Sequence, residues 1–437
     1  MKLFSFKGGV HPPERKEETL YKEIEKVSEP EKVYIPMLQH IGTIVEPIVN
    51  IGDYVKRGQK IADANALMAV PIHSSVSGKI IGIENMPFPL SGTVKTIIIE
   101  NDLKNEEKFY GKIENYKEFN SEELLKEIRD RGIVGQGGAA FPTHIKLNPP
   151  KNYVIDTLLL NGAECEPYLN TDNRVMVEYG EKIVEGIKIA LYILNINKAI
   201  IAIEDNKKEA IENLKKITKN YENIDIAIVK TKYPQGGEKQ LIKAVINRVV
   251  PSKKLPAEIG VIVLNVQTAK AIYEEIVEGK PLIDRILTVG GKGLLKQTNF
   301  EVKIGTPFNK ILLECGYNSE VTEKLIMGGP MMGVAQYSED VPVIKGTSGI
   351  LALTNEEIRP YEPKNCIKCG RCIEVCPMNL VPLLFANLAE DSEWEKIENN
   401  NIFDCIECGT CAYICPANRP LTEAIKIGKA KIRAMKK

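Results

Sequence analysis

The same cysteine spacing occurs twice near the C-terminus: Cys366-Ile-Lys-Cys369-Gly-Arg-Cys372-Ile-Glu-Val-Cys376-Pro377 and Cys405-Ile-Glu-Cys408-Gly-Thr-Cys411-Ala-Tyr-Ile-Cys415-Pro416. Three thiolates at this spacing wrap one loop around a cubane of iron and sulfide, and the fourth, followed by proline, ligates the other cluster. The runs therefore predict two 4Fe–4S clusters that share ligands across the loops. The expected ligands are Cys366, Cys369, Cys372 and Cys415 for cluster 1, and Cys405, Cys408, Cys411 and Cys376 for cluster 2.

Structural zinc and disulfides are the other uses of clustered cysteines. A structural zinc ion takes four ligands, usually in paired Cys-x-x-Cys spacing. Disulfide frameworks are typical of shorter, secreted chains with denser cysteines. Here the two runs fall between residues 366 and 415 of a 437-residue chain. The pattern favours iron–sulfur clusters in a reducing compartment, and hence a protein that moves single electrons.

Composition limits the classes of function. Lys+Arg and Asp+Glu are both 58, so the formal net charge is zero, which does not suggest a nucleic-acid partner. The length predicts two to four domains. No run of about eighteen apolar residues predicts a membrane span, and the first residues do not resemble a signal peptide. We expect a cytoplasmic protein that meets a membrane only through partners.

Residues 31–100 are rich in short β-type runs separated by Gly and Pro. The apolar alternation of 49–61 has Gly52 and Gly58 at turn positions, and 71–80 repeats that rhythm. The two half-motifs resemble a barrel-sandwich domain of the biotinyl/lipoyl type. That family attaches its cofactor to a Lys between the halves, but 62–69 contains no Lys. The resemblance therefore favours a scaffold over a swinging-arm carrier.

The middle of the chain alternates between strand and helix patterns. After a charged linker over 101–120, a helix is expected from Ser121. The alternation from about residue 150 predicts a mostly parallel α/β sheet. Residues 283–335 return to short β runs, and 340–365 are expected to be a linker. The expected strands are 154–160, 198–203, 224–229 and 261–264, and the expected helices are 178–194, 207–218, 238–249 and 268–277.

A glycine-rich stretch precedes the first of these strands. It reads Gly132-Ile-Val-Gly135-Gln-Gly137-Gly138-Ala-Ala-Phe141-Pro142-Thr143-His-Ile-Lys146. Adjacent glycines let the backbone approach a flat or phosphorylated ligand, and Lys146 is placed to meet a phosphate. It is not a Walker A loop, because no Gly-Lys-Ser/Thr follows. An ordinary glycine turn is the alternative interpretation.

Polar residues also follow the ends of predicted strands. Asn161-Gly-Ala-Glu164-Cys165-Glu166-Pro167 comes after one strand, and Asn265-Val-Gln267-Thr268 after another. Tyr233-Pro-Gln-Gly236-Gly237-Glu238 begins a helix, whose free N–H groups are available to a ligand. Each patch alone is explained by loop or cap chemistry. Together with the glycine stretch they indicate a cofactor site at the carboxyl edge of an α/β sheet.

The spacing Gly135-x-Gly-Gly-Ala-x-Phe-Pro-Thr-x-x-Lys146 and the Asn161–Pro167 patch resemble the NADH-binding flavoprotein subunit of respiratory complex I. The combination with Phe6-Lys-Gly-Gly9-Val-His11-Pro-Pro13, the barrel-sandwich segment and the two cysteine runs resembles the RnfC family, which belongs to the Rnf ion-translocating ferredoxin:NAD oxidoreductases. The departures are Gln136 in place of Arg, and Ala140 and His144 in place of Gly.

This resemblance implies FMN and NAD(H) as cofactors, with residue roles carried over by position. Gly135, Gly137, Gly138 and Lys146 would hold the flavin phosphate, and Asn161, Glu164 and Glu166 would lie near the isoalloxazine. Phe141 and Glu238 would lie near the nicotinamide, and Asn265 and Thr268 would contact phosphate. Of these, Glu164, Glu166 and Glu238 are the residues expected at the redox centre.

The resemblance implies a multidomain α/β and α+β chain: a barrel-sandwich over 1–115, a Rossmann-like FMN/NADH domain over 116–282, a β-grasp domain of the soluble-ligand-binding type over 283–338, and a helical two-cluster ferredoxin-type domain over 339–437. It implies a peripheral subunit on the cytoplasmic side of the cell membrane, with Rnf membrane subunits and a ferredoxin-like subunit as partners. Two alternatives stay open: a soluble relative serving an amino-acid or cobalamin reductase, and an electron wire without enzymatic activity.

Overall fold

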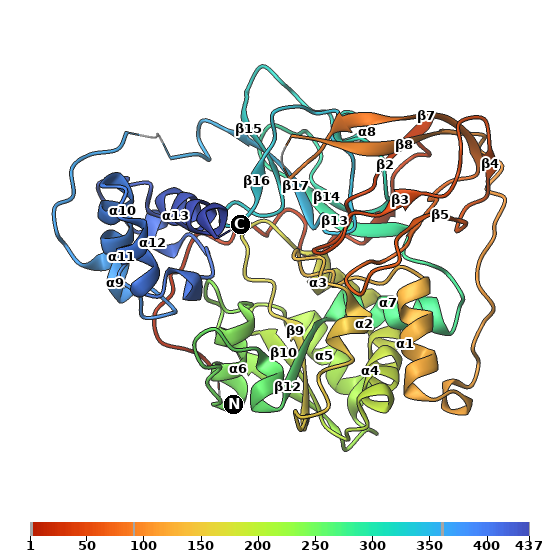
Figure 1. Ribbon diagram of the computed structural model, residues 1–437, viewed down its shortest axis with the longest axis horizontal. Helices are drawn as coiled ribbons and strands as arrows, with labels where there is room; N and C mark the ends of the chain where they lie inside the picture. The colour runs from red at the N-terminus through yellow and green to blue at the C-terminus, as the bar shows by residue number, and fades with distance from the viewer. Residues whose placement is uncertain (1–2, 91, 360–361, 437) are drawn as a thin grey trace.

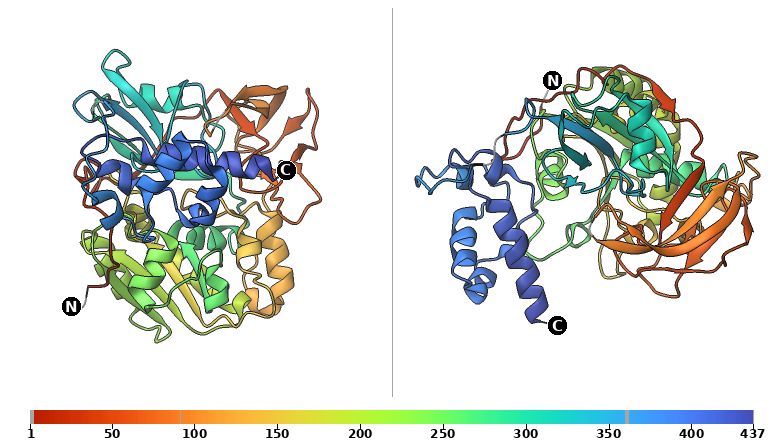
Figure 2. Two further views of the ribbon diagram at one scale, coloured as in Figure 1. Left: turned by 60° about the vertical axis from the view of Figure 1, so that its left-hand side comes forward. Right: turned by 90° about the horizontal axis from the view of Figure 1, so that it is seen from above.

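The computed structural model describes residues 3–90, 92–359 and 362–436. Within these residues the strands form four sheets, and a set of helices near the C-terminus carries the cysteines. Figure 1 shows this helical module beside the rest of the chain, with the α/β sheet below and the other sheets above. Figure 2 shows the long helix α13 (Leu421–Met435) running along the module.

The first two sheets form the barrel-sandwich unit. Alternate side chains of the strands, among them Val33, Ile35 and Ile97, are fully buried between the sheets. At Gly78 (φ +154°) an added Cβ would lie 1.9 Å from the carbonyl oxygen of Glu100, so this hairpin requires glycine. The sheets are β2 (Lys32–Pro36), β8 (Thr93–Asn101), β7 (Gly78–Pro87) and β4 (Tyr54–Val55), and β3 (Glu46–Pro47), β5 (Lys60–Asp63) and β6 (Ile72–His73).

The central sheet is parallel throughout, in the order β11-β10-β9-β12. Its strands are buried on both faces: Leu158 and Leu160 face one set of helices, whereas Leu159 faces α6. Such two-sided burial explains their continuous apolar runs. The elements are β9 (Thr157–Gly162), β10 (Ala199–Glu204), β11 (Ile224–Val229), β12 (Val261–Asn265), α1 (Ser121–Asp130), α2 (Thr143–Lys146), α5 (Lys208–Thr218), α6 (Glu238–Ile246) and α7 (Val266–Ile276).

The helix expected over 178–194 is wrong at its start. Two helices occupy this region, α3 (Thr171–Glu178) and α4 (Gly180–Leu194), which meet at Tyr179. Helix α3 buries polar residues, including Asp172 and Arg174, so it has no amphipathic pattern that sequence reasoning detects. Helix α4 packs tightly on α7, because a Cβ on Gly186 would lie 1.8 Å from the carbonyl oxygen of Ala269.

The third sheet has the order β1-β14-β13-β17-β15-β16. It takes β1 and β17 from outside residues 283–338, so the expected linker over 340–365 is wrong where β17 lies. This strand is an apolar run buried between two neighbours. The β-grasp assignment and the domain boundaries stay predictions. The elements are β1 (Ile24–Lys26), β13 (Asp284–Gly290), β14 (Thr298–Lys303), β15 (Thr322–Met327), β16 (Val334–Ala335), β17 (Gly349–Thr354) and α8 (Phe308–Glu314).

The cysteine module is built from short helices around an apolar core that includes Phe385 and Ile425. Its two loops repeat the same backbone, since Gly370 and Gly409 both have a left-handed φ (76° and 78°). Trp394 packs against this core, as expected for a packing residue. Besides α13, the helices are α9 (Arg371–Glu374), α10 (Pro382–Glu390), α11 (Trp394–Asn399) and α12 (Thr410–Tyr413).

The N-terminal segment, residues 4–26, connects these units. Phe4 pairs with Val229 of the central sheet, the N–H of Gly9 donates to the carbonyl of Val375 (2.8 Å), and β1 pairs with β14. A Cβ on Gly9 would lie 2.5 Å from the carbonyl oxygen of Tyr233, which gives a physical reason for the glycine pair at this point.

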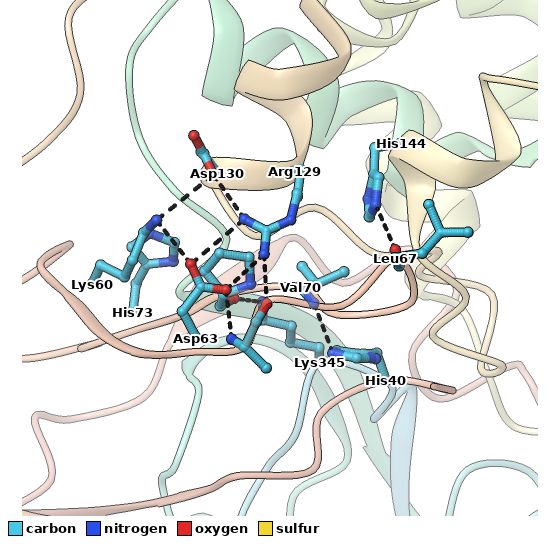
Figure 3. A network of polar contacts seen from close by, with 12 residues as sticks. His40, Lys60, Asp63, Leu67, Val70, His73, Arg129, Asp130, His144 and Lys345 are labelled. Atoms are coloured by element: carbon cyan, nitrogen blue, oxygen red, sulfur yellow. Dashed lines mark hydrogen bonds and ion pairs between the residues drawn. The ribbon is translucent and has the colours of Figure 1, made fainter. Parts of the chain in front are cut away.

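A polar network joins the barrel-sandwich unit to α1 and the loop after it (Figure 3). Arg129 bonds Asp63 (Nη2–Oδ1, 2.8 Å), which also accepts from Lys60. The buried ammonium of Lys345 donates to the carbonyls of Pro71 and Gly132 (3.0 and 2.6 Å). Because Gly132 begins the glycine stretch, this network fixes the base of that loop.

Candidate flavin site and cluster cavities

Two cavities in the helical module are each lined by four cysteines. Each cavity takes three cysteines from one run and the last cysteine of the other run. The crossed grouping that the spacing predicted is therefore the grouping that the chain brings together, although the ligand assignment itself stays a prediction. The first cavity is lined by Cys366, Cys369, Cys372 and Cys415, and the second by Cys376, Cys405, Cys408 and Cys411.

The donors and walls of these cavities fit iron–sulfur clusters. The walls are largely apolar, with Leu383 and Leu421 in the first cavity and Phe385 and Ile425 in the second. Among the described residues, no three or more His, Cys, Asp or Glu side chains are arranged to hold a single metal ion. A zinc ion draws its sulfur ligands to about 2.3 Å from one centre, whereas a cubane of irons and sulfides spreads its ligands more widely.

Burial controls the charge of the cysteines in the second cavity. It raises the pKa of Cys405 to about 11 and that of Cys411 to about 12. These side chains are neutral thiols at pH 7 unless a metal's positive charge stabilises the thiolate. Two backbone N–H groups, of Glu407 and Leu380, donate to Cys405 and Cys376 sulfurs (both 3.3 Å), and such bonds tune a cluster's potential.

The two cavities differ in their exposure to solvent. Cys376, Cys408 and Cys411 are buried at 6–8% exposure. In the first cavity, Cys369 is exposed and Cys366 is half-buried. Cluster 2 would thus lie inside the protein and cluster 1 at its surface.

The glycine stretch forms a loop anchored at both ends. The N–H of Gly135 donates to the carbonyl of Phe141 (2.8 Å), which closes the loop. The N–H of Gln136 donates to Thr268 at the start of α7 (2.9 Å), and Gly137 lies against Asn265. The loop therefore rests on the N-terminus of α7. At Gly138, φ is +98° and the space above it is open, which leaves a bare backbone surface for a ligand.

Arg285 supports this loop from below, and sequence reasoning missed it. Its buried guanidinium, from β13, donates to the carbonyl and side-chain oxygens of Gln136 and to Gln267 (3.1 Å). Burial lowers the pKa of Arg285 to about 10, and Asp172 opposes that shift. The only sequence signal was a charged residue at the start of an apolar strand. In effect, Arg285 supplies positive charge beneath a loop where the complex I motif has Arg in place of Gln136.

Lys146 and Glu238, predicted for phosphate and nicotinamide contacts, are brought together as an ion pair (2.9 Å). Lys146 also donates to the carbonyl of Val263 at the end of β12 (2.9 Å). Both side chains stay partly exposed, so they are accessible to a ligand.

The polar residues after β9 and β12 meet at one edge of the sheet. Asn161 and Asn265 are register partners on neighbouring strands. The amide of Asn161 donates to the carbonyl of Gly236 (2.8 Å), and that of Asn265 donates to Asp172 (2.7 Å). The predicted carboxyl-edge site is therefore assembled from three separate stretches of the chain.

Glu164 binds the N-terminus of α3. Its carboxylate accepts from the N–H groups of Asp172 and Asn173 (2.8 and 3.1 Å) and from the hydroxyl of Thr171 (3.0 Å). A carboxylate at this position satisfies free helix N–H groups and the helix dipole. Its observed role is to fix α3 beside the site, and its predicted role near the flavin stays a prediction.

Glu166 binds a loop of the third sheet. Its carboxylate accepts from the N–H groups of Met331 and Met332 (3.0 and 2.9 Å). Burial raises the pKa of Glu166 from 4.5 to about 7, although those two bonds oppose the shift. Glu166 is the site carboxylate whose charge changes near neutral pH.

This raised pKa predicts a pH-dependent stability. The folded chain holds the Glu166 proton that the unfolded chain has released, so this contribution is present below pH 4.5 and is lost as pH rises through 7. Relative to wild type, Glu166→Gln should gain thermal stability between pH 5 and 8. Melting temperatures across this range would measure it, with the exposed Glu212→Gln as control. Parallel pH profiles for wild type and Glu166→Gln would contradict the prediction.

Tyr233 connects this edge to the second cysteine cavity. It is 1% exposed, and its hydroxyl donates to the carbonyl of Cys408 (2.7 Å). Tyr233 also packs in one apolar cluster with Cys408 and Cys165, next to Glu166. Gln240 of α6 adds a second contact, to Met378 (3.1 Å). The second cavity therefore adjoins the candidate flavin site, a contact that sequence reasoning had no signal to find.

The fold and these sites define an iron–sulfur flavoprotein. The sequence matches the family described as the Nuo51 FMN-binding domain over residues 128–274, and the 4Fe-4S dicluster domain over 365–419. It matches the RnfC barrel sandwich hybrid domain over residues 4–104. The predictions of a barrel-sandwich unit, an FMN-binding α/β unit and a two-cluster unit are thereby confirmed.

Curated relatives extend over nearly the whole chain. A subunit of the Na(+)-translocating ferredoxin:NAD(+) oxidoreductase complex of Acetobacterium woodii is 46% identical, over 99% of this chain and 98% of the relative. The corresponding proton-translocating subunit of Clostridium ljungdahlii is 46% identical over 99% and 95%, and the ion-translocating one of Rhodobacter capsulatus 40% over 99% and 84%. The chain belongs to the RnfC family of ion-translocating oxidoreductase subunits.

A solved structure shares part of the fold. The NAD+-reducing [NiFe]-hydrogenase in its air-oxidized state aligns with a TM-score of 0.51 and 17% identity, over 72% of this chain and 61% of that chain. In the part of the chain that the structure describes, none of the helices has the length and apolar character needed to span a bilayer.

Proposed function

We propose that this chain is the peripheral subunit of an ion-translocating ferredoxin:NAD oxidoreductase that exchanges electrons between NAD(H), FMN and two 4Fe–4S clusters. The contact between Tyr233 and Cys408 carries this proposal, because it places a cluster cavity beside the flavin-type edge of the sheet. Partner subunits would hold the chain at the cytoplasmic side of the membrane, and a ferredoxin-like subunit would exchange electrons with it.

The chain's residues would position the cofactors rather than act as acids or bases. Bound FMN would supply the step between two-electron hydride chemistry and single-electron transfer. The open backbone at Gly138 and the N-terminus of α7 offer N–H groups to its phosphate, with Lys146 alongside. Arg285 adds fixed positive charge below. The proposed contacts are Gly135, Gly137, Gly138, Lys146, Asn161, Glu164 and Glu166 for FMN, Phe141 and Glu238 for the nicotinamide, and Asn265 and Thr268 for phosphate.

Anaerobic titration with NADH tests this proposal. The full chain, reconstituted with iron, sulfide and FMN, should bind flavin, and NADH should bleach the flavin absorbance before the cluster absorbance. Lys146→Met should weaken flavin binding about 10-fold or more, since an ion pair to phosphate is lost, whereas exposed Lys151→Met should not. A chain that binds no flavin, or whose flavin does not respond to NADH, would leave only the electron-wire interpretation.

A further inference from the structure

The surface over the first cysteine cavity is apolar at its centre. Ile367, between two of the cavity's cysteines, is 67% exposed, and Ile373 is 43% exposed. Cys369 itself is exposed. In Figure 1 the neighbouring helices α9 and α10 lie on the side of the module away from the rest of the chain. A cluster in this cavity would therefore lie just below a solvent-facing surface.

The rim of this surface is basic. Lys364, Lys368 and Arg371 are exposed, and none of them forms an ion pair with another residue of the described ranges. Between residues 363 and 373 there is no Asp or Glu, although Glu362 and Glu374 flank the segment. The charged side chains that line the cavity are both arginines, Arg371 and Arg419, whereas the second cavity has Glu407.

We propose that this surface, the cluster 1 face, docks a small acidic iron–sulfur protein that carries one electron at a time. Its residues are Lys364, Ile367, Lys368, Cys369, Arg371 and Ile373. Unpaired basic side chains around an exposed apolar centre fit a partner with carboxylates around its own cluster. Encounters between electron-transfer proteins bury little surface, so the few residues of this face are sufficient.

The arrangement also fixes an order of transfer. A reduced carrier would lose one electron as cluster 1 gains one, with no bond formed and no proton moved. Cluster 2, which adjoins Tyr233, would then stand between cluster 1 and the flavin. The docking site rests on the proposed function and names the surface at which its protein partner delivers or collects electrons.

Stopped-flow mixing of the reconstituted full chain with an excess of pre-reduced acidic two-cluster ferredoxin tests the proposal. Lys364→Glu/Lys368→Glu should lower the second-order rate about 10-fold or more at low ionic strength, and high salt should remove the difference. Lys426→Glu/Lys431→Glu, an equal charge change on exposed residues of α13, should lower it less than about twofold. Reduction by cationic methyl viologen should not be slowed by either change.

Three results would overturn the proposal: equal effects of the two double variants, no effect of the first, or a wild-type rate that is insensitive to salt. The salt dependence needs no variant, so it decides the matter even if a charge reversal impairs cluster assembly. Flavin reduction by NADH is a separate measurement. A flavin that does not respond to NADH, with salt-dependent transfer from ferredoxin retained, would contradict the proposed function and leave the docking site intact.

Discussion

Replacing Cys376 with Ser should remove cluster 2 and leave cluster 1 in place, although Cys376 belongs to the first cysteine run. The reason is that its thiol lines the cavity of the second run, with Cys405, Cys408 and Cys411. Iron content should fall by about half, because one of two four-iron clusters is lost. NADH should then no longer reduce cluster 1, since the cofactor next to Tyr233 is missing. Iron analysis and low-temperature EPR measure both effects.

Two matched variants complete this test. Cys415→Ser should remove cluster 1 and leave cluster 2 reducible by NADH, and Cys372→Ser should behave like Cys415→Ser. The buried Cys315, outside both cavities, provides the control as Cys315→Ala. Loss of the same cluster in Cys376→Ser and Cys372→Ser would mean that each run holds its own cluster, contrary to the crossed grouping.

Replacing Gly186 with Ala should strongly destabilise the central α/β unit. In an open helix this change would stabilise by about 1 kcal/mol. Here the added methyl would lie 1.8 Å from the carbonyl oxygen of Ala269, which is backbone and cannot move aside. Forcing α4 and α7 apart should cost roughly 3 kcal/mol or more. Because α7 carries Asn265 and Thr268, FMN affinity should fall along with stability.

Urea unfolding followed by circular dichroism, together with FMN retention on gel filtration, measures this effect. Gly111→Ala is the control, because a Cβ there meets nothing within 4 Å and its backbone conformation is ordinary. Equal stability of Gly186→Ala and wild type would show that the two helices can separate without cost.

The parts of the fold that follow a local pattern were predicted from sequence. The cysteine grouping depends on spacing alone, and the strands of the central sheet appear as apolar runs because helices cover both faces. Helix α3 was missed because its buried face is polar, bound to Glu164 and to residues far along the chain. Strand β17 was expected to be a linker, since its pairing with β13 and β15 depends on distant residues.

The candidate site followed the same division. Residues at the ends of β9 and β12 were predicted to meet, because parallel strands place their carboxyl ends at one edge. Arg285 and Tyr233 were not predicted as parts of the site, because each acts across about 150 or more residues: Arg285 reaches Gln136, and Tyr233 reaches Cys408. Such contacts leave no periodic signal in a single sequence.

The N-terminal segment has a consequence for biosynthesis. A ribosome makes residues 4–26 before it makes any of their partners at Val229, Val375 and β14. Domains generally fold as units during synthesis, in order from the N-terminus. This segment is an exception, since it must wait as an unpaired strand until the cysteine loops emerge. Its docking is then a late event that signals a fully made chain, and resistance of residues 4–26 to protease would report that maturation.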